Sequence, residues 1–391
     1  MDEKQALVPR LRFPEFRDAG EWSTDLVKGL VVTVTPPKKL TSDQYKNEGR
    51  FPVIDQSQDY ICGWTNDEDA LVSVESPLIV FGDHTCSLKI THQSFAQGAD
   101  GIKILKSSDK IEPEFLYQYL LFFPVTMESY KRHFSTLKER LVVYPDKKTG
   151  EQQKIADCLQ SLDALIAAQA DKIDALKAHK KGLMQKLFPR EGETVPRLRF
   201  PEFRGAGEWG RTQLSNQVEL ISGLHLSPTE YSDSGEIPYF TGPSDYSNEL
   251  STVRKWTARS ENVGRSNDTL ITVKGNGVGE LLRLTLDEVA MGRQLMAVRP
   301  SIAHGSFIFY FLETQRQRLI ELASGNLIPG LSRGDILSLE ILVPEKQEQI
   351  KVANCLSALD ALITAATEDL DALKAHKKGL MQQLFPMQKT T

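Results

Sequence analysis

Apolar residues recur at alternating steps of three and four along two stretches of the chain, near residues 155–187 and 352–384. The first series consists of Leu159, Leu162, Ile166, Ile173, Leu176, Leu183 and Leu187, with gaps at Gln169 and Lys180. The second consists of Leu356, Leu359, Ile363, Ala366, Leu370, Leu373, Lys377, Leu380 and Leu384. This spacing is typical of a coiled-coil seam. It predicts two helices of about 35 residues, each about 50 Å long, that end at Pro189 and Pro386.

Neither predicted helix can bury its apolar seam alone. We expect the two helices to pack together within the chain, while pairing with a second chain remains an open alternative. Lys180 and Lys377 occupy equivalent seam positions, and we expect their stems to lie on the seam while the ammonium groups reach water. A buried lysine that fixes the register is the alternative. The Ala-His-Lys-Lys stretches at 178–181 and 375–378 suit a solvated helix end better than a phosphate or metal site.

The chain also contains an internal repeat. Residues 8–22 and 195–209 are identical except that Asp18 is replaced by Gly205, and residues 174–185 are identical to 371–382. The order is therefore a short lead-in, a variable block and a helix, and then the same again. A period of nearly 200 residues is too long for a solenoid repeat, so each unit is predicted to be a domain plus a long helix.

The predicted boundaries follow this order. Residues 1–150 form the lead-in and first domain, 151–189 the first helix, 190–345 the second lead-in and domain, 346–386 the second helix, and 387–391 a tail. Each block reads as β-rich with one aromatic helical stretch, at 114–121 and 307–312, so the predicted fold class is α+β. We align 76–85 with 268–277, and the polar turn 134–138 with 323–330. The framework matches while the turns differ, as expected if the turns recognise different ligands.

The turns supply the candidate DNA contacts. Residues 273–279 lack the order of a phosphate-binding loop and predict a tight hairpin, with or without a DNA contact. Arginine, glutamine and asparagine are suited to base edges, whereas any single turn residue can equally be structural. The candidates are Asp83, His84, Thr85, Ser135, Thr136, Lys138, Lys274, Gly275, Asn276, Arg293, Gln294 and Asn326.

Charge and composition narrow the function. The chain carries a formal charge of −5, and neither variable block has the basic excess of an autonomous DNA-binding domain. Partners would then have to supply most phosphate contacts. Cys62, Cys86, Cys158 and Cys355 lack metal-binding spacing and are expected to be buried thiols in a reducing cytoplasm. We expect no signal peptide and no apolar run long enough to cross a membrane. No catalytic, cofactor or metal site is predicted.

Four sequence features together resemble the specificity subunits of type I restriction-modification systems. They are the doubled P-x-L-R-F-P-E-F lead-in, the helix entry at 344–353 with its looser copy at 145–156, the repeated L-D-A-L-I, and the ending L-K-A-H-K-K-G-L-M-Q-x-L-F-P. The S-G-N-L-I-P-G-L-S stretch at 324–332 is similar to the second half-repeat of that family. Block one departs from it at 135–138.

The resemblance implies a non-catalytic DNA-recognition subunit. Two target-recognition domains would each recognise one half of a split sequence, and two antiparallel helices would set the gap. The helices and lead-ins would dock two modification subunits, which bind S-adenosylmethionine and methylate adenine. Restriction subunits that use ATP and Mg would join this complex. The alternative is a structural coiled-coil adaptor that assembles partners without recognising DNA, which leaves the two divergent blocks unexplained.

Overall fold

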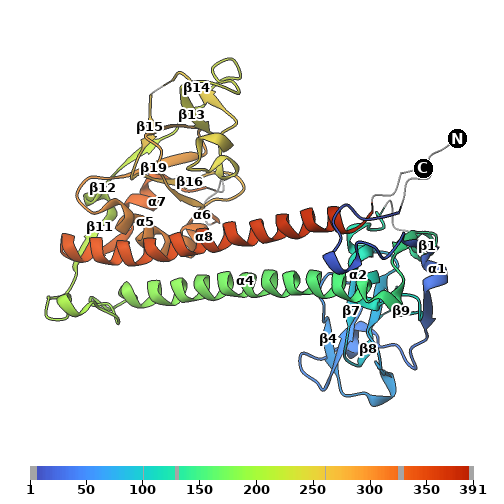
Figure 1. The fold of residues 1–391 in the computed structure, drawn as a ribbon. Coiled ribbons are helices and arrows are strands. Elements are labelled where there is room, and N and C mark those ends of the chain that lie inside the picture. Colours follow the sequence, from blue (N-terminus) through green and yellow to red (C-terminus); the bar gives the residue numbers. More distant parts are fainter. Residues whose placement is uncertain (1–6, 100, 128–131, 260, 325–329, 387–391) are drawn as a thin grey trace. The chain divides into compact units, whose positions relative to one another are not determined.

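The computed structural model describes residues 7–386, except for 100, 128–131, 260 and 325–329. The chain divides into two compact units: unit 1 comprises residues 1–170 and 368–391, and unit 2 comprises residues 171–367. Each unit contains one mixed α/β domain together with a segment of each of two long helices (Figure 1).

Three small sheets build the domain of unit 1. One is an antiparallel pair, β1 (Ser23–Leu26) with β10 (Leu141–Tyr144). The second is antiparallel, in the order β2 (Val31–Val34), β9 (Ile102–Ser107), β6 (Leu78–Gly82) and β7 (Leu88–Thr91). The third has the order β4 (Gly63–Thr65), β3 (Phe51–Ile54), β8 (Phe95–Gln97) and β5 (Leu71–Val72), with β3 and β8 parallel. The helices are α1 (Val27–Leu30), α2 (Pro113–Phe122) and α3 (Phe134–Lys138).

Unit 2 repeats this topology strand for strand. The pair is β11 (Gly210–Gln213) with β20 (Glu340–Val343). The antiparallel sheet is β12 (Val218–Ser222), β19 (Leu295–Pro300), β16 (Thr269–Thr272) and β17 (Leu281–Arg283), and the mixed sheet is β14 (Trp256–Thr257), β13 (Ile237–Phe240), β18 (Glu288–Met291) and β15 (Val263–Arg265). The helices are α5 (Gly305–Thr314), α6 (Arg316–Ser324) and α7 (Arg333–Leu337). The predicted α+β class with an internal repeat is confirmed.

Two long helices are present where the heptad pattern predicts them. They are α4 (Glu151–Leu187) and α8 (Lys346–Leu384). Every predicted seam residue is buried or half-buried. In contrast, Leu165 and Leu362, which lie off the seam, are 54% and 55% exposed. The 3.5-residue spacing therefore identified the packed face correctly.

The seam lysines pair with aspartates across the two helices instead of reaching water. In unit 2, Lys180 Nζ lies 2.5 Å from an Asp360 carboxylate oxygen, and in unit 1, Lys377 Nζ lies 2.6 Å from Asp163. The expectation of solvated ammonium groups was wrong, because the aspartate of each L-D-A-L-I segment lies opposite the lysine of the other helix. Each pair joins an early residue of one helix to a late residue of the other, so the helical segments run antiparallel within each unit.

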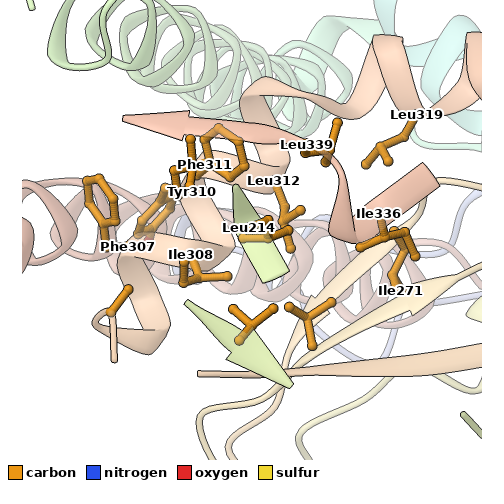
Figure 2. Packing of buried hydrophobic residues seen from close by; sticks show 14 of the residues in the cluster. Leu214, Ile271, Phe307, Ile308, Tyr310, Phe311, Leu312, Leu319, Ile336 and Leu339 are labelled. Carbon is orange, nitrogen blue, oxygen red and sulfur yellow. The ribbon is translucent and has the colours of Figure 1, made fainter. Parts of the chain in front are cut away.

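Each long helix ends in the aromatic core of a unit. In unit 1, Phe385 packs edge-on against Phe115, with ring centroids 5.6 Å apart, and Trp22 lies 5.9 Å from the same ring. In unit 2, Phe188 and Trp209 make the equivalent contacts with Phe307, at 5.2 and 5.7 Å. Figure 2 shows part of the unit 2 core, in which Phe307, Ile308, Tyr310, Phe311 and Leu312 of α5 gather with Leu214, Ile271 and Ile336. These contacts give the repeated L-F-P ending a packing role.

Buried ion pairs fasten each lead-in to the start of a long helix. Arg12 forms two hydrogen bonds of 2.7 Å with Glu151, and Arg199 forms equivalent bonds of 2.7 and 2.8 Å with Glu348. All four side chains are less than 10% exposed. The helix-entry motif thus supplies the glutamates that the lead-in arginines require.

One helix in the described part of the chain, α8, contains a window long and apolar enough to cross a membrane by length and composition alone, with a mean hydropathy of 1.3. The prediction that no apolar run is that long was too strict. Of the residues in this window 22% are buried, so the packing of Val352, Ala353 and Leu356 in the core of unit 2 accounts for part of the apolar content of α8.

The four cysteines are half-buried and form no disulfide. The Sγ of Cys62 lies 3.1 Å from the Val53 carbonyl oxygen. Burial, reinforced by Asp55, raises the pKa of Cys62 to about 12. This thiol is therefore protonated at neutral pH, as expected of a structural cysteine.

Candidate nucleic-acid interface

Three loops of unit 2 that are distant in sequence meet around one open cavity of about 860 Å³. The loops are 241–246 after β13, the hairpin 273–280 between β16 and β17, and 292–294 before β19. The cavity is lined by Thr241, Gly242, Pro243, Ser244, Tyr246, Asn276, Gly277, Glu280 and Gln294. The structure thus brings together two predicted candidates, Asn276 and Gln294, that lie 18 positions apart in the sequence.

The predicted hairpin at 273–279 is confirmed. β16 and β17 pair antiparallel, and the Gly279 N–H donates to the Thr272 carbonyl at 2.9 Å. Gly275 and Gly277 have φ of +81° and +91°, a region that other residues rarely adopt. Lys274 and Asn276 are exposed at the tip. The hairpin can therefore offer a cation and an amide to a ligand, and its contact with DNA stays a prediction.

Side-chain hydrogen bonds to the backbone hold the 241–246 loop. Asp245 accepts from the Thr241 N–H at 2.7 Å and the Thr241 hydroxyl at 2.6 Å, and Lys255 Nζ lies 3.3 Å away. Burial alone would raise the pKa of Asp245, but these hydrogen bonds and Lys255 together hold it below its ordinary value. The carboxylate is thus charged at neutral pH and stabilises the cavity wall. We did not predict this loop, although its G-P-S-D sequence is a turn signal.

The corresponding loops of unit 1, residues 55–60, 82–87 and the described part of 98–101, are held by a different set of bonds. Thr85 and Ser87 donate their hydroxyl hydrogens to the Gln56 carbonyl at 2.7 and 3.1 Å. Lys89 Nζ donates to the carbonyls of Asp55 and Asp59 at 2.8 and 2.5 Å. Because Lys89 is buried by this arrangement, its pKa is lowered.

The candidates of unit 1 divide into buried and exposed groups. Asp83 is buried and accepts a 2.8 Å hydrogen bond from the Phe134 N–H, so it joins two loops. Thr85 is bonded internally, and Lys138 lies 5.5 Å above the Phe134 ring. Ser135 and Thr136 are exposed on α3, and His84 is half-buried. In unit 2, Arg293 is exposed and Gln294 half-buried. Asn326 lies outside the described residues.

Three matched backbone hydrogen bonds define which loop residues correspond between the units. In unit 1, the N–H groups of Asp83, His133 and Gly98 donate to the carbonyls of Gly101, Asp83 and Ile54, in that order. In unit 2, the N–H groups of Val273, Leu331 and Gly292 donate to the carbonyls of Gln294, Val273 and Phe240 in the same way. Asp83 therefore corresponds to Val273, whereas the sequence alignment matched Phe81 to Val273. The alignment was two residues out, because a shift of two along a strand preserves the pattern of buried faces.

The same bonds correct a second alignment. Helix α3 follows His133 and helix α7 follows Leu331, so these two short helices correspond. Leu137 of α3 and Ile336 of α7 are both buried. The sequence alignment instead placed 134–138 beside 323–330, because both segments are polar. Ser135, Thr136 and Lys138 thus have their counterparts in α7.

No group of three potential metal ligands occurs in the residues that the structure describes. The cavity of unit 2 contains amides, hydroxyls and exposed backbone, and Glu280 on its wall is ion-paired with Arg316. This donor and acceptor set suits the edges of bases better than a metal or a reaction centre. Lys274 and Arg293 are the exposed loop cations that lie closest in sequence to the residues lining the cavity. Two cations are few for a surface that binds DNA without partner subunits.

The chain contains one domain topology twice, with two different loop clusters. This architecture is that of a recognition protein with two separate binding domains. Residues 207–375 match the family model described as the type I restriction modification DNA specificity domain. The chain is 25% identical over 309 residues to the type I restriction enzyme MjaX specificity subunit of Methanocaldococcus jannaschii, covering 74% of this chain and 71% of that protein. It is 21% identical over 376 residues to the EcoR124I/EcoR124II specificity subunit of Escherichia coli, covering 90% and 89%.

A solved structure shares the fold. The type I restriction-modification S subunit from M. genitalium matches with a TM-score of 0.72 at 18% identity, covering 98% of this chain and all of that one. Together, the family model and the relatives support the prediction of a type I restriction-modification specificity subunit. They support a DNA-recognition subunit rather than an enzyme, one that acts with DNA and other restriction-modification subunits.

Proposed function

We propose that each unit recognises one half of a split DNA sequence through its own loop cluster. The observation that carries this proposal is the repetition of one topology, strand for strand, around two loop clusters that are held by different side-chain hydrogen bonds. A protein that bound one ligand twice would repeat its binding residues along with its framework. Here the framework is repeated and the loops are not.

The two long helices set the gap between the half-sites in this proposal. A helix of 37 residues, such as α4, spans about 55 Å at 1.5 Å per residue. The antiparallel pairs Lys180–Asp360 and Lys377–Asp163 support a fixed register, because each pair lies on a different segment of the helices. Packing within one chain accounts for both seams, so no second copy is required.

Two modification subunits dock on the repeated surfaces. The same apolar residues are exposed to nearly the same extent in both copies: Val8 and Val195 at 39% each, Leu11 and Leu198 at 41% and 40%, and Leu165 and Leu362 at 54% and 55%. Exposed apolar residues that form a contiguous patch mark partner surfaces, and these repeated residues are the candidates for such a surface. Because the set is present twice, it suits two copies of one partner.

The chemistry of such a complex would reside in its partners. Modification subunits would bind S-adenosylmethionine and methylate adenine, and restriction subunits, where present, would use ATP and Mg. This chain would contribute DNA recognition in the cytoplasm and bind none of these cofactors itself.

Exchanging residues 210–344 for the block of another family member tests the proposal. The exchanged subunit is expressed with its modification subunits, and methylated adenines are mapped by long-read sequencing. We expect one half of the methylated motif to change, while the other half and the gap stay as in the wild type. The matched control exchanges residues 23–144 and should change only the opposite half. A motif that stays the same in both exchanges would refute recognition by the units and favour the adaptor alternative.

A further inference from the structure

Two loop positions face each other in both units. In each unit one of them is glutamine and the other is glycine, but the glutamine lies at the first position in unit 1 and at the second in unit 2. The first position is the second residue after β3 or β13, which is Gln56 in unit 1 and Gly242 in unit 2. The second position immediately precedes β9 or β19, and it is Gly101 in unit 1 and Gln294 in unit 2. The correspondence is fixed by the matched backbone bonds: Asp83 to Gly101 is 2.6 Å and Val273 to Gln294 is 2.7 Å.

Each glutamine occupies space that its facing glycine leaves open. A Cβ atom placed on Gly101 would lie 2.7 Å from Gln56 Oε1, closer than real Cβ atoms approach. In unit 2, a Cβ atom on Gly242 would lie 3.1 Å from Gln294 Oε1. Both units therefore place one amide between these loops, but it extends from opposite sides.

The glutamine amides are not used to hold the domains together. Gln56 Oε1 is buried without a hydrogen-bond partner among the described residues. The structure records no hydrogen bond from the Gln294 side chain to any residue that it describes, although this side chain lines the cavity with Asn276. Structural glutamines of the same chain behave differently. Gln349 accepts from the His304 N–H and donates to the Pro344 carbonyl, both at 2.8 Å.

An unbonded amide in a recognition loop has a suitable ligand in DNA. The NH2 group of a glutamine amide can donate to N7 of adenine, and its carbonyl oxygen can accept from N6, in the major groove. Leaving an amide carbonyl buried without a partner is unfavourable. A bound base edge would supply the missing partner once the Gln56 side chain turns outward from Gly101.

We propose that Gln56 and Gln294 are equivalent specificity-determining residues, each of which contacts an adenine–thymine pair in its own half of the DNA sequence. This inference rests on the proposed function of the two units. It assigns a role to Gln56, which the sequence did not single out, and selects Gln294 from the twelve candidates. Because the amide extends from opposite loops, the two half-sites need not place their adenine at the same position.

The test uses the specificity subunit in complex with its modification subunits. Methylation rates are measured on duplexes with the wild-type motif and on a set with each base pair replaced in turn. We expect Gln294→Ala to lower the rate on the wild-type duplex by about 5- to 100-fold and to remove discrimination at one adenine–thymine position of one half. Gln56→Ala should do the same in the other half only. Gln93→Ala and Gln213→Ala remove exposed glutamines outside the loop clusters and should change neither half.

Folding and function are separated by two further measurements. Gln56→Glu and Gln294→Glu preserve side-chain size but replace the amide donor, so they should lose the same discrimination. The melting temperature should stay near that of the wild type for Gln294→Glu, which lines the open cavity, and fall for Gln56→Glu, whose carboxylate would be buried. If discrimination at every position survives in the alanine and glutamate variants, the inference is overturned. A wild-type complex that methylates no split motif would instead overturn the proposed function itself.

Discussion

The two units have the same ion pairs in their packed framework and different hydrogen bonds in their open loop clusters. Arg12–Glu151 and Arg199–Glu348 have the same geometry within 0.1 Å, and the two lysine–aspartate pairs recur in both units. At the loop clusters, by contrast, Thr85 and Ser87 hold the first unit together, whereas Asp245 and Lys255 hold the second. The difference indicates that one framework can carry loops that are held by different side-chain contacts.

Some contacts are repeated only in part, and these lie where each domain packs against the long helices. In unit 2, Tyr310 donates a 2.6 Å hydrogen bond to Asp360, and in unit 1, Gln118 donates a 2.7 Å bond to Asp163. The aspartate and its lysine are repeated, but the third partner is not. The helices thus offer one invariant acceptor to each domain, and the domain can meet it with different chemistry.

The largest effect is expected from changing one helix without the other. Inserting seven residues between Ala168 and Asp174 of α4 lengthens that helix by about 10 Å. Since α8 is unchanged, the inserted turns must buckle, or else one lysine–aspartate pair is lost. We expect methylation to be abolished. A second insertion of seven residues between Ala365 and Asp371 of α8 restores the match, and methylation should return with a gap longer by about three base pairs.

This pair of insertions also measures the gap itself. The methylated motif is mapped for the double insertion and for the wild type. An unchanged gap in an active double insertion would refute the role of the helices in spacing. An active single insertion with the wild-type gap would refute it as well.

A smaller but well-defined effect is expected from the buried arginines. Arg199→Ala leaves Glu348 buried without its partner, which costs about 3–5 kcal/mol. Arg12→Ala should cost the same within about 1 kcal/mol, because Glu151 is buried equally. Urea denaturation measures both. Lys28→Ala removes an exposed pair with Glu139 and serves as the control, with no measurable change expected.

A double variant separates the charge from the packing. Arg199→Met combined with Glu348→Leu removes both charges and should recover most of the lost free energy of unfolding. If each single variant lowers the free energy of unfolding by less than about 1 kcal/mol, or if the losses in the two units differ widely, the two ion pairs do not stabilise the lead-ins equally.

Much of this framework was predictable from the sequence because the sequence contains it as an internal repeat. The heptad seam identified α4 and α8, and the repeated turns and apolar runs identified the main strands and α2 and α5. The short edge strands, such as β5 (Leu71–Val72) and β14 (Trp256–Thr257), were not predicted. Two residues are too few to show alternation, and pairing with a neighbouring strand is what makes them regular.

The recognition loops were predictable only in part. Asn276 and Gln294 stood out because each lies beside a glycine turn, and the structure places both on one cavity. Gln56, Thr241 and Asp245 were missed, since their positions depend on loops that meet only in the folded domain. The lysine–aspartate pairs were missed for the same reason: each seam position was assessed on its own helix, and the partner lies on the other.

The smallest expected effect compares the two unmatched partners of the repeated aspartates. Tyr310→Phe removes the hydroxyl bonded to Asp360, and a hydrogen bond to a charged group is worth about 1.5–3 kcal/mol. Gln118→Met removes a similar bond to Asp163, but it also removes an amide oxygen that is buried without a partner. We therefore expect Tyr310→Phe to cost about 2 kcal/mol and Gln118→Met less than about 1 kcal/mol.

The pH dependence of the Tyr310→Phe effect follows from the same contacts. Burial, and then the bond to Asp360, raises the pKa of Tyr310 above its ordinary value. A raised pKa means that the protonated hydroxyl stabilises the fold fully below the pKa of an unfolded tyrosine, about 10, and is lost only as pH rises beyond it. The free-energy difference between wild type and Tyr310→Phe should thus be constant from pH 6 to pH 9, measured by denaturation at each pH. A difference that already falls across this range would show that the hydroxyl does not donate to Asp360.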